Sequence, residues 1–357
     1  MVKPRLFPGR TKIRFFGVAI VAACTTAAAA IYLAFPRQLG GQLKSSGSQI
    51  SILLDGRYGA QFAGEMIATK EKYLPENVSV RSNAADPNFV ETVARQGAIG
   101  VTSGHKFMLS AWNGAPVTAF AASLLDTSVA IVTLENSGIA RPADLMGRRL
   151  GYQPQSEGEA VVDAMLAQLG LSRSQVIKVS HLSSVDSLRD GEVDAIISKV
   201  MEQPLLHGQT RPRLKLIKPQ DYSIHVPGLV YFASNDLLRS RPGLIAEVLL
   251  GIIRGWQFVY ADYASSVPLL VGFNPAELDP TSVESDLRNL RSLVMPVGGR
   301  IADYDESRWR TLRDILLFAK LGEETVPLSR LVDFQTLRNV YRRAPIAASR
   351  GAGDIGK

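Results

Sequence analysis

Polar residues gather where the first apolar run of this sequence ends, at the point where a strand would give way to a turn. The run 50–54 is followed by Asp55, Arg57 and Tyr58. An arginine in this place could pair with an anion, and a tyrosine could stack on a planar molecule. The same residues could also form a plain solvated turn. We treat all three as candidate ligand-binding residues.

Two further groups combine a serine with the expected start of a helix. Ser103-Gly104-His105 follows the apolar run 98–102, and Gln155-Ser156-Glu157 precedes a helical stretch at 159–169. Backbone N–H groups at a helix start favour an anionic partner. A serine in this place is also the ordinary N-cap of a helix, so each group has a purely structural explanation as well.

The charges among the candidates point to two different kinds of solute. Arg57 and Lys106 favour an anion such as a sulfonate or a carboxylate, whereas Glu157 and Glu202 favour an amine or a pyrimidine. Glu202 follows the expected strand at 195–197 only loosely. The identity and charge of the ligand stay open at this point.

The sequence indicates neither a metal site nor a catalytic constellation. Its four histidines (His105, His181, His207 and His225) lie far apart, and none forms an H-x-x-x-H pair. The single cysteine, Cys24, allows neither a disulfide within the chain nor a cysteine cluster. No order of serine, histidine and aspartate rises above chance. We expect no cofactor, no metal and no enzyme activity.

The net charge of +7 over 357 residues is concentrated in residues 1–14, an expected cytoplasmic basic region. Lys3, Arg5, Arg10, Lys12 and Arg14 precede every acidic residue, and without them the net charge falls to about +2. The rest of the chain is therefore nearly balanced. Nucleic-acid binding needs a basic face on the folded domain, so we expect no nucleic-acid partner.

An uncharged segment of 21 residues, 15–35, is long enough to span a bilayer core as a helix. Three interpretations remain open: an uncleaved anchor, a cleavable signal with an A-x-A-type site in 27–30, and a lipoprotein signal in which Cys24 is acylated. The basic residues before the segment predict that the chain after it lies outside the cytoplasmic membrane. Residues 36–49, rich in Gly and Ser, then form a flexible linker.

From residue 50 to about 233, runs that favour strands alternate with helical stretches, and from 242 the pattern is largely helical. Alternation of this kind predicts an α/β fold with mostly parallel strands covered by helices on both faces. Ligands bind at the carboxyl ends of the strands in such sheets, which is where the candidate residues lie. The tail 344–357 is expected to be disordered.

The segment 137–152, SGIARPADLMGRRLGY, resembles a signature of periplasmic solute-binding proteins of the nitrate/sulfonate/taurine transport group, which includes binders of thiamine-pyrimidine precursors. The phrases at 62–80, 90–104, 188–198 and 227–262 agree with that group in order and spacing. The resemblance covers roughly residues 50–265.

The chain also departs from that group at informative places. The first strand ends in LLDGRYG, without the tryptophan that often lies near the ligand, and Ile99 stands where an acidic residue is usual. The related thiamine-pyrimidine synthases carry a cysteine-rich motif, and nothing in this sequence matches it.

The resemblance implies a type II periplasmic binding protein fold, in which two α/β lobes are joined by two crossover segments that form a hinge. The crossovers would lie near 121–132 and 222–233. The first lobe would then comprise 50–125 plus 230–343, and the second lobe 126–229.

The implied crossovers add four candidate ligand-binding residues. The group usually makes backbone contacts at the end of the fourth strand, here Ala122 and Ser123. Tyr222 and His225 lie at the second crossover.

The resemblance further implies the substrate-binding component of an ABC importer, at the outer face of the cytoplasmic membrane or in the periplasm. Such a receptor captures a small solute (sulfonate, nitrate or pyrimidine-like) by hinge closure and passes it to permease and ATPase subunits. We expect a monomer. An enzyme on the same fold acting on a pyrimidine-type precursor, and a membrane-tethered sensor or interaction protein that has lost its ligand, are the alternatives.

Overall fold

The computed structural model describes residues 49–84, 86–181, 184–199, 213–296, 298–303 and 305–343. The chain divides into two units after Gly47, and every described residue belongs to the second. The expected membrane segment, the lipidation candidate Cys24, the candidate Glu202 and the tail 344–357 lie outside the described residues.

The described residues form two five-stranded sheets with the same plan. The first runs in the order β2 (Val78–Ser82), β1 (Ile50–Leu54), β3 (Ile99–Ser103), β10 (Leu229–Ser234), β4 (Val117–Ala122). The second runs in the order β7 (Ile177–Ser180), β6 (Arg149–Tyr152), β8 (Ala195–Lys199), β5 (Val129–Leu134), β9 (Leu214–Ile217). In each sheet the first three strands are parallel, and the fourth, β10 or β5, is antiparallel to both of its neighbours.

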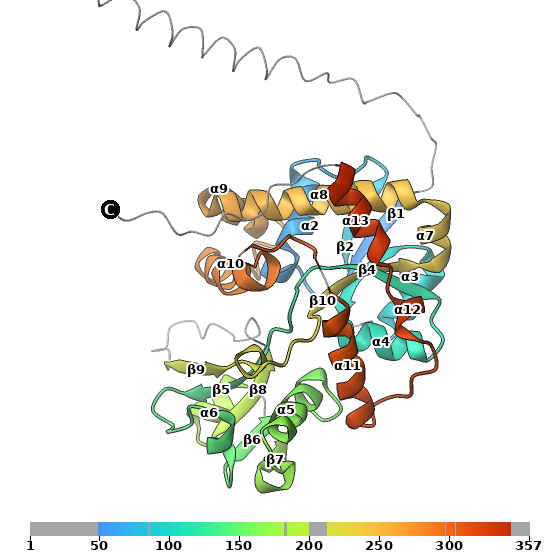
Figure 1. The fold of residues 1–357 in the computed structure, drawn as a ribbon. Coiled ribbons are helices and arrows are strands. Elements are labelled where there is room, and N and C mark those ends of the chain that lie inside the picture. Colours follow the sequence, from blue (N-terminus) through green and yellow to red (C-terminus); the bar gives the residue numbers. More distant parts are fainter. Residues whose placement is uncertain are drawn as a thin grey trace, which may run out of the picture. The chain divides into compact units, whose positions relative to one another are not determined.

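The chain passes twice between the sheets (Figure 1), and each passage leads directly into the antiparallel strand of the sheet that it enters. The first crossover, 123–128, joins β4 to β5, and the second, 218–228, joins β9 to β10. The Thr127 amide donates to the Val226 carbonyl and the Gly228 amide to the Leu124 carbonyl, so the two crossovers lie side by side. The expected two-lobed α/β fold with two crossovers is confirmed.

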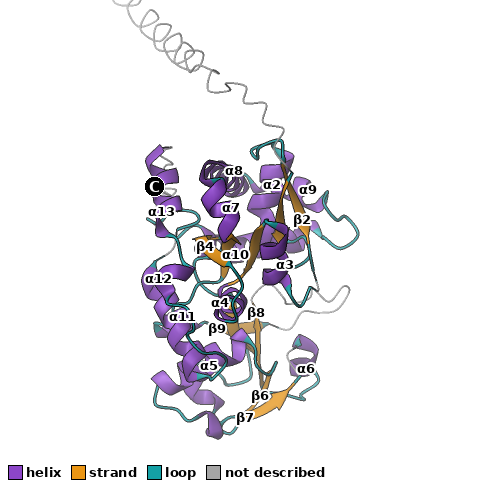
Figure 2. Ribbon diagram, turned by 90° about the vertical axis from the view of Figure 1, so that its right-hand side faces the viewer, coloured by secondary structure: helices purple, strands orange, loops and turns teal. Residues whose placement is uncertain are grey.

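Helices cover both sheets, as the alternating pattern predicts (Figure 2). The elements on the first sheet are η1 (Ala60–Phe62), α2 (Ala63–Lys70), α3 (Phe89–Gln96), α4 (Gly104–Trp112), α7 (Asn235–Ser240), α8 (Pro242–Ala261), α9 (Tyr263–Val271), α10 (Pro280–Val294), α11 (Glu306–Phe318), α12 (Leu328–Leu331) and α13 (Phe334–Arg343). The helices between β5 and β10 in the sequence, which belong to the second lobe, are η2 (Pro142–Leu145), α5 (Glu157–Gln168), η3 (Arg173–Gln175), α6 (Val185–Arg189) and η4 (Pro219–Tyr222). Helix α11 contacts both α4 and α5, so it bridges the lobes.

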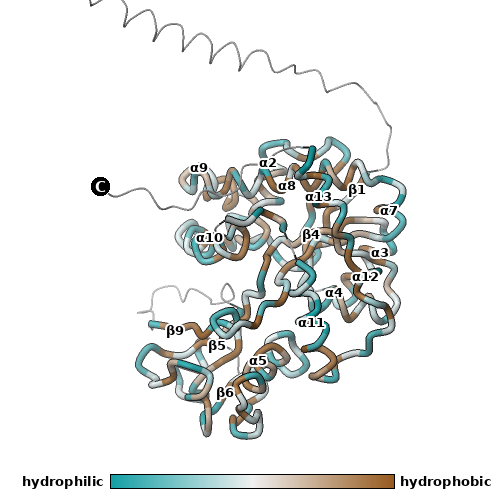
Figure 3. Tube along the Cα trace, viewed as in Figure 1, coloured by the Kyte–Doolittle hydropathy of each residue, from teal (hydrophilic) through white to brown (hydrophobic). Residues whose placement is uncertain are grey.

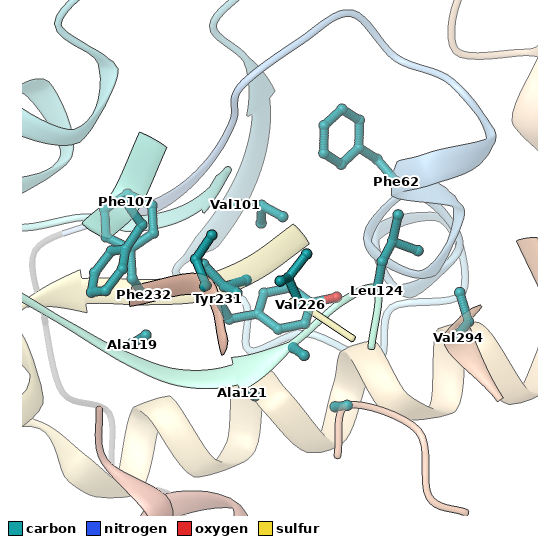
Figure 4. Close-up of a cluster of buried hydrophobic side chains, with 14 of the residues drawn as sticks. Phe62, Val101, Phe107, Ala119, Ala121, Leu124, Val226, Tyr231, Phe232 and Val294 are labelled. Carbon is teal, nitrogen blue, oxygen red and sulfur yellow. The ribbon is translucent and has the colours of Figure 1, made fainter. Parts of the chain in front are cut away.

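The apolar residues of the central strands lie inside, between the helical layers (Figure 3). Phe62, Phe107, Tyr231 and Phe232 belong to one buried cluster, and Leu124 and Val226 of the two crossovers are part of it (Figure 4). The three tryptophans, Trp112, Trp256 and Trp309, are almost fully buried. Helix α8 is long and apolar enough to cross a membrane, but most of it is buried against its neighbours, as in the core helix of a folded domain.

Helices α2 and α8 meet through glycines. A Cβ atom on Gly255 would lie 2.0 Å from the Gly64 carbonyl oxygen, and one on Gly64 would lie 2.3 Å from the Trp256 ring. A side chain in either place would push the helices apart, because the obstacles are backbone and a buried ring. Gly243 also lies in α8, but no atom lies within 4 Å of an added Cβ.

We expect Gly255→Ala to lower the free energy of unfolding by about 3 kcal/mol through overpacking. Gly243→Ala should leave it unchanged or raise it by up to about 1 kcal/mol, because alanine favours the helix. Chemical denaturation of the two variants measures both values. Equal stability of the variants would contradict the proposed helix contact.

Glu65, on α2, is fully buried in the first lobe, and neither of its carboxyl oxygens has a hydrogen-bond partner among the described residues. The nearby Tyr231 hydroxyl donates its hydrogen bond to Ser123 at 3.1 Å. Burial raises the pKa of Glu65 from its usual 4.5 to about 7, and its own backbone amide and Tyr231 offset this only in part. The carboxyl is therefore largely neutral below pH 7.

Between pH 4.5 and 7 the folded chain holds a proton on Glu65 that the unfolded chain has released, so the contribution of Glu65 to stability should fall as the pH rises through this window. The loss should be on the order of 3 kcal/mol and should level off above the folded pKa. The pKa values of His105 (lowered to about 4) and Asp286 (raised to about 6) add their own pH dependence, so the readout is the difference from the unmodified chain. The decline due to Glu65 should be absent in Glu65→Gln, whereas the exposed control Glu247→Gln should keep it. Denaturation across the pH range is the measurement, and an unchanged decline in Glu65→Gln would refute the assignment.

Candidate functional site

A cavity of about 840 Å³ lies where the carboxyl ends of strands from both sheets face each other. Its walls are Asp55, Ser103, His105, Lys106, Val129, Gln153, Ser156, Glu157, Gly158, His181, Ser184, Ile197, Ser198, Lys199 and Leu229. A smaller hollow of about 360 Å³ shares five of these residues and adds Gly56, Arg57, Gln61, Phe62, Leu124, Thr127, Ser128 and Gly228. The candidate site is thus a continuous groove with walls from both lobes and from both crossovers.

Asp55 follows β1, and its carboxylate is held inside the first lobe. Lys106 donates to it from 3.1 and 3.2 Å, and the Thr102 hydroxyl donates a short hydrogen bond to it. The ammonium of Lys106 also lies 5.6 Å from the centre of the Phe89 ring. Asp55 therefore compensates the positive charge of Lys106, which the sequence suggested as a partner for an anion.

Ser103 is the N-cap of α4, because its hydroxyl accepts from the Lys106 amide at 3.1 Å. Ser103 also lines the cavity, so the structural and the ligand-binding roles are compatible. The Gly104 amide donates to the Gly228 carbonyl at 2.8 Å. A Cβ on Gly104 would lie 2.9 Å from the Pro227 carbonyl oxygen. Gly104 therefore ties α4 to the second crossover and is not among the lining residues.

His105 lines the cavity, and its Nε2 atom is buried without a hydrogen-bond partner among the described residues. Burial lowers the pKa of His105 to about 4, and the positive charge of Lys199 adds to the effect. The imidazole is therefore neutral at physiological pH and offers a ligand a donor or an acceptor, but no charge.

The second lobe contributes the start of α5. The Ser156 hydroxyl caps this helix by accepting from the Glu159 amide at 3.2 Å, and Glu157 follows as its first residue. Glu157 is 8% exposed, and its carboxylate accepts from the Thr127 hydroxyl of the first crossover at 2.7 Å. Gln155 has a left-handed backbone (φ 58°), and its amide donates to Glu159. Gln155 does not line the cavity, although Ser156 and Glu157 do.

Several lining residues were missed by the sequence analysis. Strand β8 runs on to Lys199, two residues past its expected end, so the side chain at its tip is Lys199. Gln153 follows β6 directly, so the rule that ligands bind at the ends of strands could have identified it. His181 and Ser184 follow β7, whose end carried no signal beyond its polarity.

Other candidates lie away from the larger cavity. Arg57 lines the smaller hollow, and its exposed side chain pairs with Glu277 at 3.1 Å. The Tyr58 ring packs against Phe273 at 5.3 Å between ring centres, and its hydroxyl accepts from the Ser82 amide. Tyr58 lines neither hollow.

The candidates at the end of β4 and the start of the first crossover, Ala122 and Ser123, have their backbone amides occupied within the protein. The Ala122 amide donates to Ala302 and the Ser123 amide donates to Leu229. Tyr222, at the end of η4, accepts from the Gln168 side chain through its carbonyl. None of the three lines either hollow.

His225 belongs to a charged cluster beside the crossovers, outside both hollows. Its Nδ1 lies 3.2 Å from both carboxylate oxygens of Asp126, a residue of the first crossover. Arg308, near the start of α11, donates to the same carboxylate from 3.1 and 3.2 Å. One mostly buried carboxylate thus connects the first crossover, the second crossover and α11.

The groove suits noncovalent binding of a small polar molecule. In the larger cavity two carboxylates, Asp55 and Glu157, and two ammonium groups, Lys106 and Lys199, come from both lobes and balance in charge. Arg57 of the smaller hollow is paired with Glu277. Within the described part of the chain, no group of three or more His, Cys, Asp or Glu side chains could hold a metal ion.

Comparison with known proteins agrees with this architecture. The family described as "NMT1/THI5 like" matches residues 77–264, more than half of the chain. A Haemophilus influenzae protein named for thiamine biosynthesis is 27% identical over 154 residues, which cover 42% of this chain and 49% of that protein. The chain thus matches only about half the length of that relative.

Two solved structures share the fold over almost their whole length. The periplasmic aliphatic sulphonate-binding protein SsuA from Escherichia coli has a TM-score of 0.65 at 15% identity, with 87% of this chain and 96% of that chain covered. A cysteine-to-serine mutant of the desulfurization enzyme DszB, in complex with biphenyl-2-sulfinic acid, has a TM-score of 0.57 at 15% identity, with 83% of this chain and 99% of that chain covered.

These similarities confirm the resemblance found in the sequence and the fold it implied. At such low identity the solved structures define the fold alone, whereas the family match extends across both crossovers and all of the second sheet. The chain belongs to the NMT1/THI5-like family and has the fold of the periplasmic solute-binding proteins.

Proposed function

We propose that this protein is the extracytoplasmic substrate-binding component of an ABC importer. The observation that supports this most strongly is the groove itself, whose polar walls come from strand ends of both lobes. A solute in that groove would contact Asp55 and Ser103 on one side and Glu157 and Lys199 on the other. Since those contacts are complete only when the lobes approach, the solute would favour the closed form.

The residue chemistry favours a small organic solute that carries both donor and acceptor groups. Glu157 supplies an anionic acceptor, Lys199 a cationic donor, and His105 a neutral polar group. A pyrimidine with an amino substituent, or a sulfonate that also bears an amine, satisfies both kinds of partner. Nitrate can accept hydrogen bonds from Lys199 but has no hydrogen to donate to Glu157, so it fits the groove less well.

A solute selective for the folded chain should raise its melting temperature. At a concentration one hundred times its Kd it should add about 2.7 kcal/mol to the stability, which corresponds to several degrees. Thermal-shift screening against sulfonates, aminosulfonates, nitrate, amines and pyrimidines measures this. A stabilising solute should also reduce the radius of gyration in solution scattering, because the lobes close. Stabilisation by none of these solutes would favour a protein that has lost its ligand.

Glu157→Gln should weaken binding of the stabilising solute by at least about tenfold if that solute donates from an amine or N–H group, since a hydrogen bond to a charged group contributes roughly 1.5–3 kcal/mol. The amide retains an oxygen for Thr127, so the fold should be preserved. The matched control is Glu192→Gln, an exposed residue in the turn before β8, which should bind normally. Isothermal titration calorimetry gives both affinities, and equal weakening in the two variants would rule out a direct role for Glu157.

A further inference from the structure

Three arginines gather on the outer side of α13. Arg300, Arg338 and Arg342 line one surface hollow together with Gln335 and Tyr341. Arg338 and Arg342 are one helical turn apart, and all three arginines are exposed. The opposite side of α13 carries Leu337 and Val340, which are buried in the first lobe. We call Arg300, Arg338 and Arg342 the arginine face.

Internal contacts hold this face in place and leave it with a net positive charge. The Arg300 guanidinium lies 4.9 Å from the centre of the Tyr341 ring, and the Tyr341 hydroxyl donates to the Ile301 carbonyl. Arg342 donates to the Asn339 side chain, a neutral group. Within the described residues, none of the three arginines forms an ion pair with a carboxylate.

The nearest capping carboxylate is already engaged. Asp333 accepts from the Gln335 amide and the Thr336 hydroxyl at the start of α13. Most exposed arginines elsewhere in the described chain do have an acidic neighbour, for example Arg288 with Glu284 and Arg310 with Glu306. Asp303 lies close enough to Tyr341 to act on its hydroxyl together with Arg300, so it offsets part of the positive charge. Three arginines beside one such carboxylate still create a local positive field that attracts an anionic surface.

The position of α13 suggests which surface that is. Figures 1 and 2, which share their vertical axis, both place α13 and α8 at the end of the first lobe farther from the second sheet. The described chain begins at the same end, because Asp55, after β1, lines the groove and Ile50 lies at the opposite end of that strand. The uncharged segment 15–35 precedes this point in the sequence.

We propose that the arginine face of α13 docks the folded body onto the headgroups of an anionic bilayer. Each arginine near such a surface strengthens association about fivefold, so two or three together favour contact without making it permanent. The groove lies at the other side of the first lobe and stays accessible. The inference rests on the proposed location at the outer face of the membrane, but it does not depend on which solute is bound.

The test is hydrogen–deuterium exchange of the full-length chain with lipid nanodiscs. One set of discs contains only zwitterionic phosphatidylcholine, and the other an equal mixture with anionic phosphatidylglycerol. We expect amide exchange in 334–343 to be at least about fivefold slower on the anionic discs. The double variant Arg338→Gln/Arg342→Gln should exchange at the same rate on both, and high salt should abolish the difference in the unmodified chain.

A charge-matched control separates this face from net charge. Arg141 and Arg213 belong to the second lobe and have 72% and 87% exposed side chains. Arg141→Gln/Arg213→Gln should keep the slow exchange on anionic discs. Equal exchange on both disc types in the unmodified chain would overturn the proposal, and so would slow exchange that persists in Arg338→Gln/Arg342→Gln.

Inorganic phosphate added to zwitterionic discs distinguishes a membrane surface from a free anion. Slower exchange of 334–343 under that condition, matching the effect of anionic discs, would mean that the arginine face binds a small anion and does not dock on lipid. No solute takes part in any arm, so failure here leaves the proposed receptor function to its own tests.

Discussion

The carboxylate of Asp126, in the first crossover, accepts hydrogen bonds from Arg308 of α11 and lies 3.2 Å from His225 of the second crossover. This one carboxylate therefore connects the two crossovers and α11. The crossovers also approach each other closely through backbone: a Cβ on Gly228 would lie 2.4 Å from the Asp126 carbonyl oxygen. Removing one member of a mostly buried charge cluster leaves the remaining charges uncompensated, which lowers the stability of the fold. Relative movement of the lobes is therefore confined to changes that keep this junction intact.

The same junction fixes the positions of polar groups in the groove. Thr127 belongs to the first crossover and donates to Glu157 of the second lobe, whereas Gly228 of the second crossover accepts from the first amide of α4. Polar groups of the site are therefore positioned by segments that both lobes share. A solute that changes the position of α4 or α5 also acts on the crossovers, which links occupancy of the groove to the angle between the lobes.

Strand and helix periodicity predicted the order of the elements and the α/β fold, because buried parallel strands read as continuous apolar runs. Asp55, Ser103, Ser156 and Glu157, which were chosen from the expected strand ends and helix starts, line the groove, and their contact with a ligand stays a prediction. The sequence could not show that β8 continues to Lys199, since Ser198 and Lys199 are polar and only pairing with β5 makes them part of the strand.

The candidates that line neither hollow share a physical feature. Tyr58, Ala122, Ser123 and Tyr222 have partners that are remote in sequence or fixed by the crossover geometry: Phe273, Ala302, Leu229 and Gln168. A side chain or amide satisfied by such a partner turns away from the groove, and one sequence gives no measure of those long-range contacts. His225 shows the same effect, because its partner Asp126 is 99 residues away.

The shared fold of SsuA and DszB means that architecture alone does not separate a receptor from an enzyme. The difference must come from the groups in the groove. Here the Asp55 carboxylate is engaged by Lys106 and Thr102, the Glu157 carboxylate accepts from Thr127, and the only cysteine of the sequence, Cys24, precedes the folded body. A general base needs a proton within hydrogen-bond reach and a nucleophile beside it. Carboxylates held by such partners present fixed charges to a solute in the groove, which is what the proposed receptor function requires.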